Sequence, residues 1–114
     1  MRRSDHLYLG HMLDNAVKAS NKVGSFTKAE FDANEDLQMV LAHLIQTIGE
    51  AASKVFESTK TAHPEIPWKE IVGIRHRIIH DYMNVNYDVL WAIATTDLEP
   101  LIAQLQSILP PEEQ

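Results

Sequence analysis

The stretch EIVGIRHRIIHDYMN, residues 70–84, combines charged and titratable side chains with the apolar spacing of a helix. Counted at about 100° per residue, its apolar residues form one stripe, made of Ile71, Val72, Ile78 and Ile79, with Tyr82 at its edge. Arg75 falls in the middle of that stripe. Burying an unpaired guanidinium costs more than packing returns. We therefore expect either a partner for Arg75 or a face that is not core.

The first half of the chain is predicted to form two long helices with a short one between them. Ser4 is the expected cap of the first helix, which runs to a Gly-Ser pair. Residues 27–30 have the spacing of a capping box and predict one short turn of helix. Asn34 is the expected cap of the longest helix, over about 35–58. Gly49 and the alanines beside it would let another helix pack closely there.

The second half is predicted to form two further helices. Pro64 and Pro67 mark a loop, because proline is excluded from a helix interior but suits its first turn. The motif helix follows, over about 68–82. A last helix begins near Tyr87, and Pro100 either kinks it or makes it stop and restart one turn later.

These elements predict an all-α fold. No run with the period of a strand is longer than a few residues. We expect a single domain over 1–114, an antiparallel bundle of four main helices with a short extra helical turn. Residues 109–114 are expected to form a frayed tail.

The composition limits the classes of function. The 114 residues are 45% hydrophobic and 23% charged, which is ordinary for a globular protein. Cysteine is absent, so disulfides, thiolate metal sites and cysteine nucleophiles are excluded. No apolar run approaches the roughly 18 residues of a membrane span, and we expect a cytoplasmic protein. Because the net charge is −6, any contact with nucleic acid needs a local basic patch.

The polar residues of the motif do not converge on one straight helix. Arg75 and Tyr82 lie within about 20° of each other in helical projection, whereas His80 is about 140° from Arg75 and shares its face with His76. Convergence needs a helix that ends at the motif or a second copy of the motif. A two-fold axis would supply that copy.

The motif RHRIIHDY resembles the Arg-x4-His-x-Tyr motif of HepT-type toxins in the HEPN ribonuclease superfamily. The resemblance extends from about Leu7 to Ile108. The position after the motif arginine is often Asn or Asp in that family, and here it is His76, a variant that the family tolerates. Three further segments are similar in the same order: IGEAASKV at 48–55, HPEIPWKEIVGIR at 63–75 and VNYDVLWAIATTDL at 85–98.

The resemblance implies a metal-independent endoribonuclease that needs no cofactor. Its homodimer would place two motifs in one cleft, with Arg75 stabilising the transition state and His80 as general acid or base. His76 and Arg77 would contact the RNA phosphates. The products would be a 2′,3′-cyclic phosphate and a 5′-hydroxyl. An MntA-like nucleotidyltransferase antitoxin would neutralise this toxin by transferring AMP to Tyr82, as in a type VII-like toxin-antitoxin system.

Each of these residues also has an ordinary structural interpretation. Arg75 could form an ion pair with a carboxylate of a neighbouring helix, and Tyr82 could be a core or interface aromatic. Glu50 lies on the polar side of its helix, where solvation would explain it, and only its place in the family-like segment IGEAASKV suggests a role. His76 and His80 have the spacing of metal ligands, but no third ligand is evident, so we expect no metal. The alternative function is a non-catalytic helical partner that docks a nucleotidyltransferase.

Overall fold

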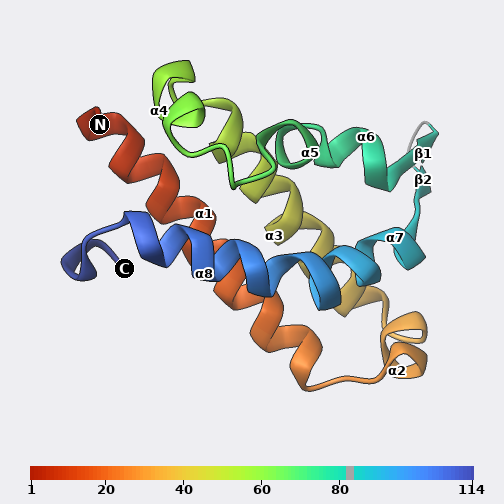
Figure 1. Ribbon diagram of the computed structural model, residues 1–114. Coiled ribbons are helices and arrows are strands. Elements are labelled where there is room, and N and C mark those ends of the chain that lie inside the picture. Colours follow the sequence, from red (N-terminus) through yellow and green to blue (C-terminus); the bar gives the residue numbers. More distant parts are fainter. Residues whose placement is uncertain (82–83) are drawn as a thin grey trace.

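The computed structural model describes residues 1–81 and 84–114, and the fold is all-α, as the sequence predicts. The long helices α1 and α3 pack against each other, and α8 packs against α1 (Figure 1). The motif segment lies along α3, and both termini lie at the opposite end of the molecule from the short strands (Figure 1). The longer helices are α1 (Arg3–Gly24), α3 (Glu35–Ser53) and α8 (Leu98–Ile108), and the short ones are α2 (Lys28–Asp32), α4 (Glu57–Ala62), α5 (Trp68–Val72), α6 (Ile74–Ile78) and α7 (Tyr87–Ala92).

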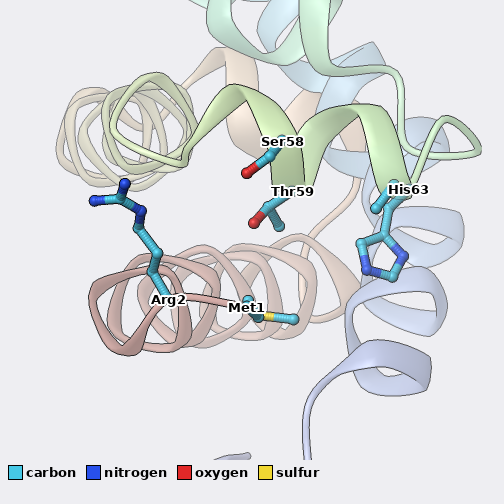
Figure 2. A pocket seen from close by; sticks show the side chains of 6 residues that line it. Met1, Arg2, Ser58, Thr59 and His63 are labelled. Atoms are coloured by element: carbon cyan, nitrogen blue, oxygen red, sulfur yellow. The ribbon is translucent and has the colours of Figure 1, made fainter.

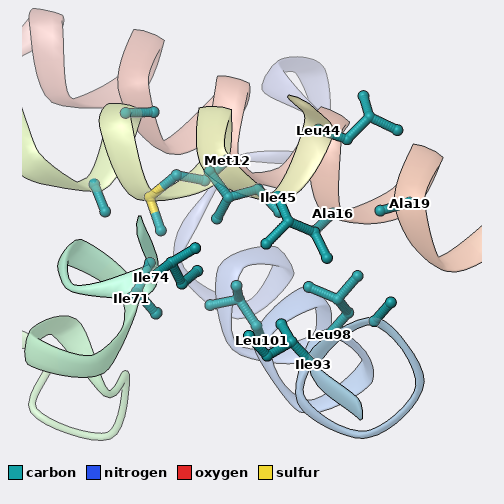
Figure 3. Close-up of a cluster of buried hydrophobic side chains, with 14 of the residues drawn as sticks. Met12, Ala16, Ala19, Leu44, Ile45, Ile71, Ile74, Ile93, Leu98 and Leu101 are labelled. Atoms are coloured by element: carbon teal, nitrogen blue, oxygen red, sulfur yellow. The ribbon is translucent and has the colours of Figure 1, made fainter. Parts of the chain in front are cut away.

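The buried side chains of these helices form one cluster. Figure 3 shows side chains from α1 and α3 facing those of α5, α6 and the C-terminal helices. The motif segment is therefore fixed on its inner side by the same core that joins the long helices. The cluster includes Met12, Ala16, Ala19, Leu44, Ile45, Ile71, Ile74, Ile93, Leu98 and Leu101.

Local caps place several helix starts where the sequence predicts them. The Thr27 hydroxyl accepts from the backbone N–H of Glu30 (3.1 Å), and the Glu30 carboxylate accepts from that of Thr27 (2.8 Å), which completes the predicted capping box. The Asn34 side chain accepts from Leu37 N–H at 3.0 Å. These bonds satisfy donors that the first helical turn leaves free.

The predicted cap at Ser4 and the predicted end of the long helix at 58 are both wrong. α1 begins at Arg3, and α3 ends at Ser53 before the separate helix α4. The buried carboxylate of Asp5 explains the break, because it accepts from the backbone N–H of Phe56 (3.1 Å) and from the hydroxyl of Thr59 (2.6 Å). One side chain near the start of α1 thus anchors the chain where α3 gives way to α4.

The C-terminal region differs from the prediction in two ways. A π-helical turn, Ile93–Asp97, joins α7 to α8, so the predicted interruption is absorbed without a break in the helical path. Pro100 has no N–H to donate to the preceding helical turn, and the π-helical turn, which is wider than an α-helical one, ends shortly before it. The tail is predicted to be frayed, whereas in the structure Pro111–Glu113 form a 3₁₀ helix and the side-chain amide of Gln114 donates to the carbonyl of Leu109 at 2.9 Å.

Within residues 1–81 and 84–114, no helix is both long enough and apolar enough to cross a bilayer.

A close backbone contact joins α3 to the motif segment. A Cβ atom added to Gly49 would lie 2.8 Å from the carbonyl oxygen of Ile71 in α5. Cβ atoms in proteins do not come that close to a neighbouring atom, so only glycine fits here. The sequence predicts such close packing at this glycine, and the structure confirms it.

Replacement of Gly49 by alanine tests this contact. The added methyl would push α5 away from α3, and overpacking of this kind costs about 1–3 kcal/mol. Urea unfolding of Gly49→Ala should therefore show a lower midpoint. Gly24→Ala is the matched control, because a methyl added there would have no atom within 4 Å and stability should be unchanged or slightly raised. Equal midpoints for Gly49→Ala and the wild type would contradict the contact.

Acid should weaken the anchor at Asp5. Burial alone would raise the pKa of this carboxyl, but hydrogen bonds from Thr59 and from the backbone at Phe56 lower it below its ordinary value of 3.8. A lowered folded-state pKa adds stability that is present above about pH 4 and is lost as the pH falls through the folded pKa. The free energy of unfolding of Asp5→Ala should thus lie about 1–3 kcal/mol below that of the wild type at pH 7.

The difference between the two proteins should shrink at pH 3. Asp14→Ala is the control, because Asp14 is an exposed carboxylate of the same helix. A difference for Asp5→Ala that stays constant from pH 7 to pH 3 would show that the ionised carboxylate does not carry the anchor.

Candidate active site

The motif segment is not the single helix over 68–82 that the sequence predicts. It breaks at Gly73 into α5 and α6, and α6 ends at Ile78. The chain continues as β1 (Ile79–Asp81), which pairs antiparallel with β2 (Asn84–Val85). Ile79 has extended backbone, and the carbonyl of Ile78 accepts from the N–H of Asn86 at 2.6 Å. Pairing with β2 and this hydrogen bond keep the residues after Ile78 from continuing the helix α6.

The end of α6 changes the geometry of the motif. His80 lies in β1, so the angle of about 140° from Arg75 on a continuous helix does not apply. The sequence allows either a helix that ends at the motif or a second copy of the motif. The structure shows the first, so the geometry of one chain no longer requires a two-fold axis.

The apolar stripe of the segment differs from the predicted one. Ile71, Ile74 and Ile78 are buried, whereas Val72 is 41% exposed. Arg75 lies on the exposed side with Val72. The face that carries Arg75 is therefore not core, which answers the question that its sequence position raises.

Arg75 lies at a small hollow between α3 and the motif segment. The hollow has a volume of about 90 Å³, and Gly49 lies in its wall. Within the part of the chain that the structure describes, the guanidinium of Arg75 has no hydrogen-bond or ion-pair partner. An ion pair with a neighbouring helix therefore does not explain this residue, and its donors are available to a ligand. The lining residues are Gln46, Gly49, Glu50, Ser53, Val72 and Arg75.

Arg77 points to a different surface from Arg75. Its Nη2 donates to Asp97 Oδ2 at 3.3 Å, and both residues line a groove of about 620 Å³ between the motif segment and α8. The helical spacing predicts an ion pair of Arg77 with Asp81 instead. That prediction is wrong, because α6 ends before Asp81, whose carboxylate accepts from the side-chain amide of Asn84.

The structure describes the other predicted site residues only in part. His76 is exposed on α6. Only the backbone of His80 is among the described parts, and Tyr82 lies outside the described residues. Within the described parts, no three His, Asp or Glu residues are grouped as metal ligands would be.

A second hollow, of about 510 Å³ and so larger than the one at Arg75, lies between the start of α1 and α4. Figure 2 shows Arg2 on one side of it and Ser58, Thr59 and His63 on the other. The Arg2 guanidinium lies over the Phe56 ring, with 3.4 Å between its carbon and the ring centroid. Arg2 is thus occupied in joining α1 to α4, and none of the motif residues lines this hollow.

Comparison with known protein families gives a match over residues 12–108 to the family described as "Ribonuclease HepT-like". The chain belongs to the HepT-like ribonuclease family. The match includes the hollow at Arg75, the end of α6 and the backbone of His80.

Several relatives of this HepT-like chain are described as ribonucleases. A candidate RNase of Caldanaerobacter subterraneus subsp. tengcongensis is 29% identical over 106 residues, which cover 93% of this chain and 95% of the relative. A protein of Thermococcus cleftensis named "Probable ribonuclease HepT" is 29% identical over 112 residues, 95% and 98% of the two chains. A candidate RNase of Methanocaldococcus jannaschii is 29% identical over 100 residues, 84% and 92% of the two chains. No solved structure is significantly similar.

The neighbours of the motif are not evident from the sequence. Gln46, Ser53 and the pairing partner Asp97 come from other helices, and no local pattern points to them. The one feature of the sequence that does indicate a neighbour of the motif is Gly49, because a small residue on a long helix indicates where a second backbone can approach. Its neighbour Glu50 shares the hollow with Arg75.

Proposed function

We propose that this HepT-like chain is the toxin of a type VII-like toxin-antitoxin system and cleaves RNA without a metal ion. The family match over residues 12–108 carries the proposal, because it includes the spacing of Arg75 and His80. The guanidinium of Arg75, which is exposed and has no partner in the described part of the chain, supports it further. A docking surface has no need of a free cation at a hollow, so this observation favours the enzyme over a non-catalytic partner of a nucleotidyltransferase.

The chemistry needs few groups because RNA carries its own nucleophile. The 2′-oxygen forms a bond to phosphorus, the bond from phosphorus to the 5′-oxygen breaks, and the products are a 2′,3′-cyclic phosphate and a 5′-hydroxyl. His80 moves the protons, since imidazole titrates near neutral pH. Arg75 holds the phosphate oxygens and stabilises the charge that develops on them. His76 contacts an RNA phosphate from the exposed side of α6. Arg77 also contacts a phosphate once RNA displaces its solvent-exposed ion pair with Asp97.

The assembly is proposed to be a homodimer in which two motifs share one cleft. Support comes from the resemblance to HepT-type toxins and from the exposed position of Arg75 with Val72 on one face. The proposed partner is an MntA-like nucleotidyltransferase antitoxin, which transfers AMP from ATP to the hydroxyl of Tyr82 and releases pyrophosphate. Tyr82 is two residues beyond His80, and the added phosphate would compete with RNA for nearby cations.

Substitution of the two catalytic residues tests the proposal. Arg75→Ala and His80→Ala should each lower the rate of RNA cleavage at least about 100-fold, because each removes a group that acts in the transition state. Arg3→Ala and His11→Ala are the matched controls, since both residues are exposed on α1, which contributes no residue to the hollow, and should leave cleavage unchanged. Full cleavage by Arg75→Ala or His80→Ala would remove that residue from its role.

Mixing the two inactive proteins tests the shared cleft. If each site takes its arginine and its histidine from different protomers, a mixture of Arg75→Ala and His80→Ala chains should regain part of the wild-type rate. A mixture that exchanges subunits and stays inactive would place both residues of each site in one chain.

The regulatory role of Tyr82 has a separate test. Incubation with the cognate nucleotidyltransferase, ATP and magnesium should add at least one AMP at Tyr82 and stop cleavage, while Tyr82→Phe should accept none there and stay active. Intact mass and peptide mapping measure the adduct. A protein without an adduct, or with one confined to Tyr8 or Tyr87, would contradict the proposed mode of neutralisation.

A further inference from the structure

Glu50 and Arg75 share the small hollow without forming an ion pair. Glu50 comes from α3 and Arg75 from α6, and their meeting depends on the close approach of the two backbones at Gly49. Glu50 is exposed, and no hydrogen bond or ion pair to its carboxylate exists within residues 1–81 and 84–114. Among the described residues, the hollow is thus lined by one acceptor and one cation that are both without a partner.

The free carboxylate needs an explanation at a site that takes RNA. A second anion beside Arg75 repels the RNA phosphates, and this cost is offset only if the carboxylate binds something on the RNA. An ionised carboxylate accepts hydrogen bonds and donates none. Of the sugar-phosphate backbone, only the 2′-hydroxyl has a proton to donate at neutral pH.

The dimensions of the hollow favour a sugar edge. Its volume of about 90 Å³ is small beside the roughly 620 Å³ of the groove at Arg77. Such a space takes the edge of a ribose more readily than a whole nucleotide. The hydroxyl of Ser53 donates to the backbone carbonyl of Glu50 at 2.6 Å, so the proton of that hydroxyl is already used and the carboxylate does not receive it.

We propose that Glu50 accepts a hydrogen bond from the 2′-hydroxyl of a nucleotide adjacent to the cleaved one. This inference rests on the proposed function, in which Arg75 holds the scissile phosphate. The reacting 2′-hydroxyl has one proton, which His80 takes, so the hydroxyl that Glu50 binds belongs to a neighbour. Glu50 is then a specificity-determining residue that distinguishes ribose from deoxyribose beside the cleavage site.

A double-mutant cycle between protein and substrate tests this role. The probes are a short single-stranded RNA with one mapped cleavage site and two versions with a single deoxyribose, one on each side of the cleaved nucleotide. All three keep the reacting 2′-hydroxyl and remain cleavable. For wild-type protein, one of the two deoxyribose substitutions should lower kcat/KM by roughly 10- to 100-fold, the value of a hydrogen bond to a charged group.

For Glu50→Ala, the same deoxyribose substitution should have almost no effect, because the acceptor is already gone. Glu50→Gln keeps an acceptor oxygen without the charge and should keep part of the sensitivity. Glu70→Ala is the matched control: it removes an exposed carboxylate of α5 that lines the groove at Arg77, and it should keep the full sensitivity of the wild type.

Additive losses from Glu50→Ala and the deoxyribose would overturn the role of Glu50 and leave the ribonuclease intact. Equal cleavage of all three probes by the wild type would do the same. Failure of the wild type to cleave the all-ribose strand would instead overturn the proposed function, and this inference with it.

Discussion

The contact between Gly49 and the backbone of Ile71 sets the position of the whole motif segment. A side chain at position 49 would lie 2.8 Å from the carbonyl oxygen of Ile71, so α5 reaches α3 only because glycine has none. Ile71 and Ile74 then enter the core, and the opposite side of the segment faces outward. Arg75 on that outward side lines the same hollow as Glu50 of α3, because the two backbones approach closely at Gly49.

The sequence predicted those parts of the fold that local chemistry determines. The capping box at Thr27 and Glu30 and the cap at Asn34 depend on residues three apart, so their pattern can be read directly. The helix ends were missed where distant residues decide them. Asp5 binds Phe56 across 51 positions of sequence, and α6 ends at Ile78, whose carbonyl is bound by Asn86 from beyond the strands.

The same distinction holds for the site. The spacing of Arg75 and His80 is a property of the sequence, and it indicated the family that the comparison then gave. The pairing of Arg77 with Asp97 was not predictable, because it depends on the π-helical turn, Ile93–Asp97, lying near the motif segment. The free state of Arg75 is also a tertiary property. In a chain of net charge −6, a guanidinium that has no ion-pair partner among the described residues is a suitable group for the anion binding that we propose.

The activity proposed for this chain is RNA cleavage through its own side chains and the 2′-hydroxyl, without a metal ion. The most direct test is incubation of the purified protein with single-stranded RNA in excess EDTA, followed by mass analysis of the product ends. Undiminished cleavage with 2′,3′-cyclic phosphate and 5′-hydroxyl ends is the predicted result. Cleavage that stops in EDTA and returns with added magnesium, or products with 3′-hydroxyl and 5′-phosphate ends, would contradict it.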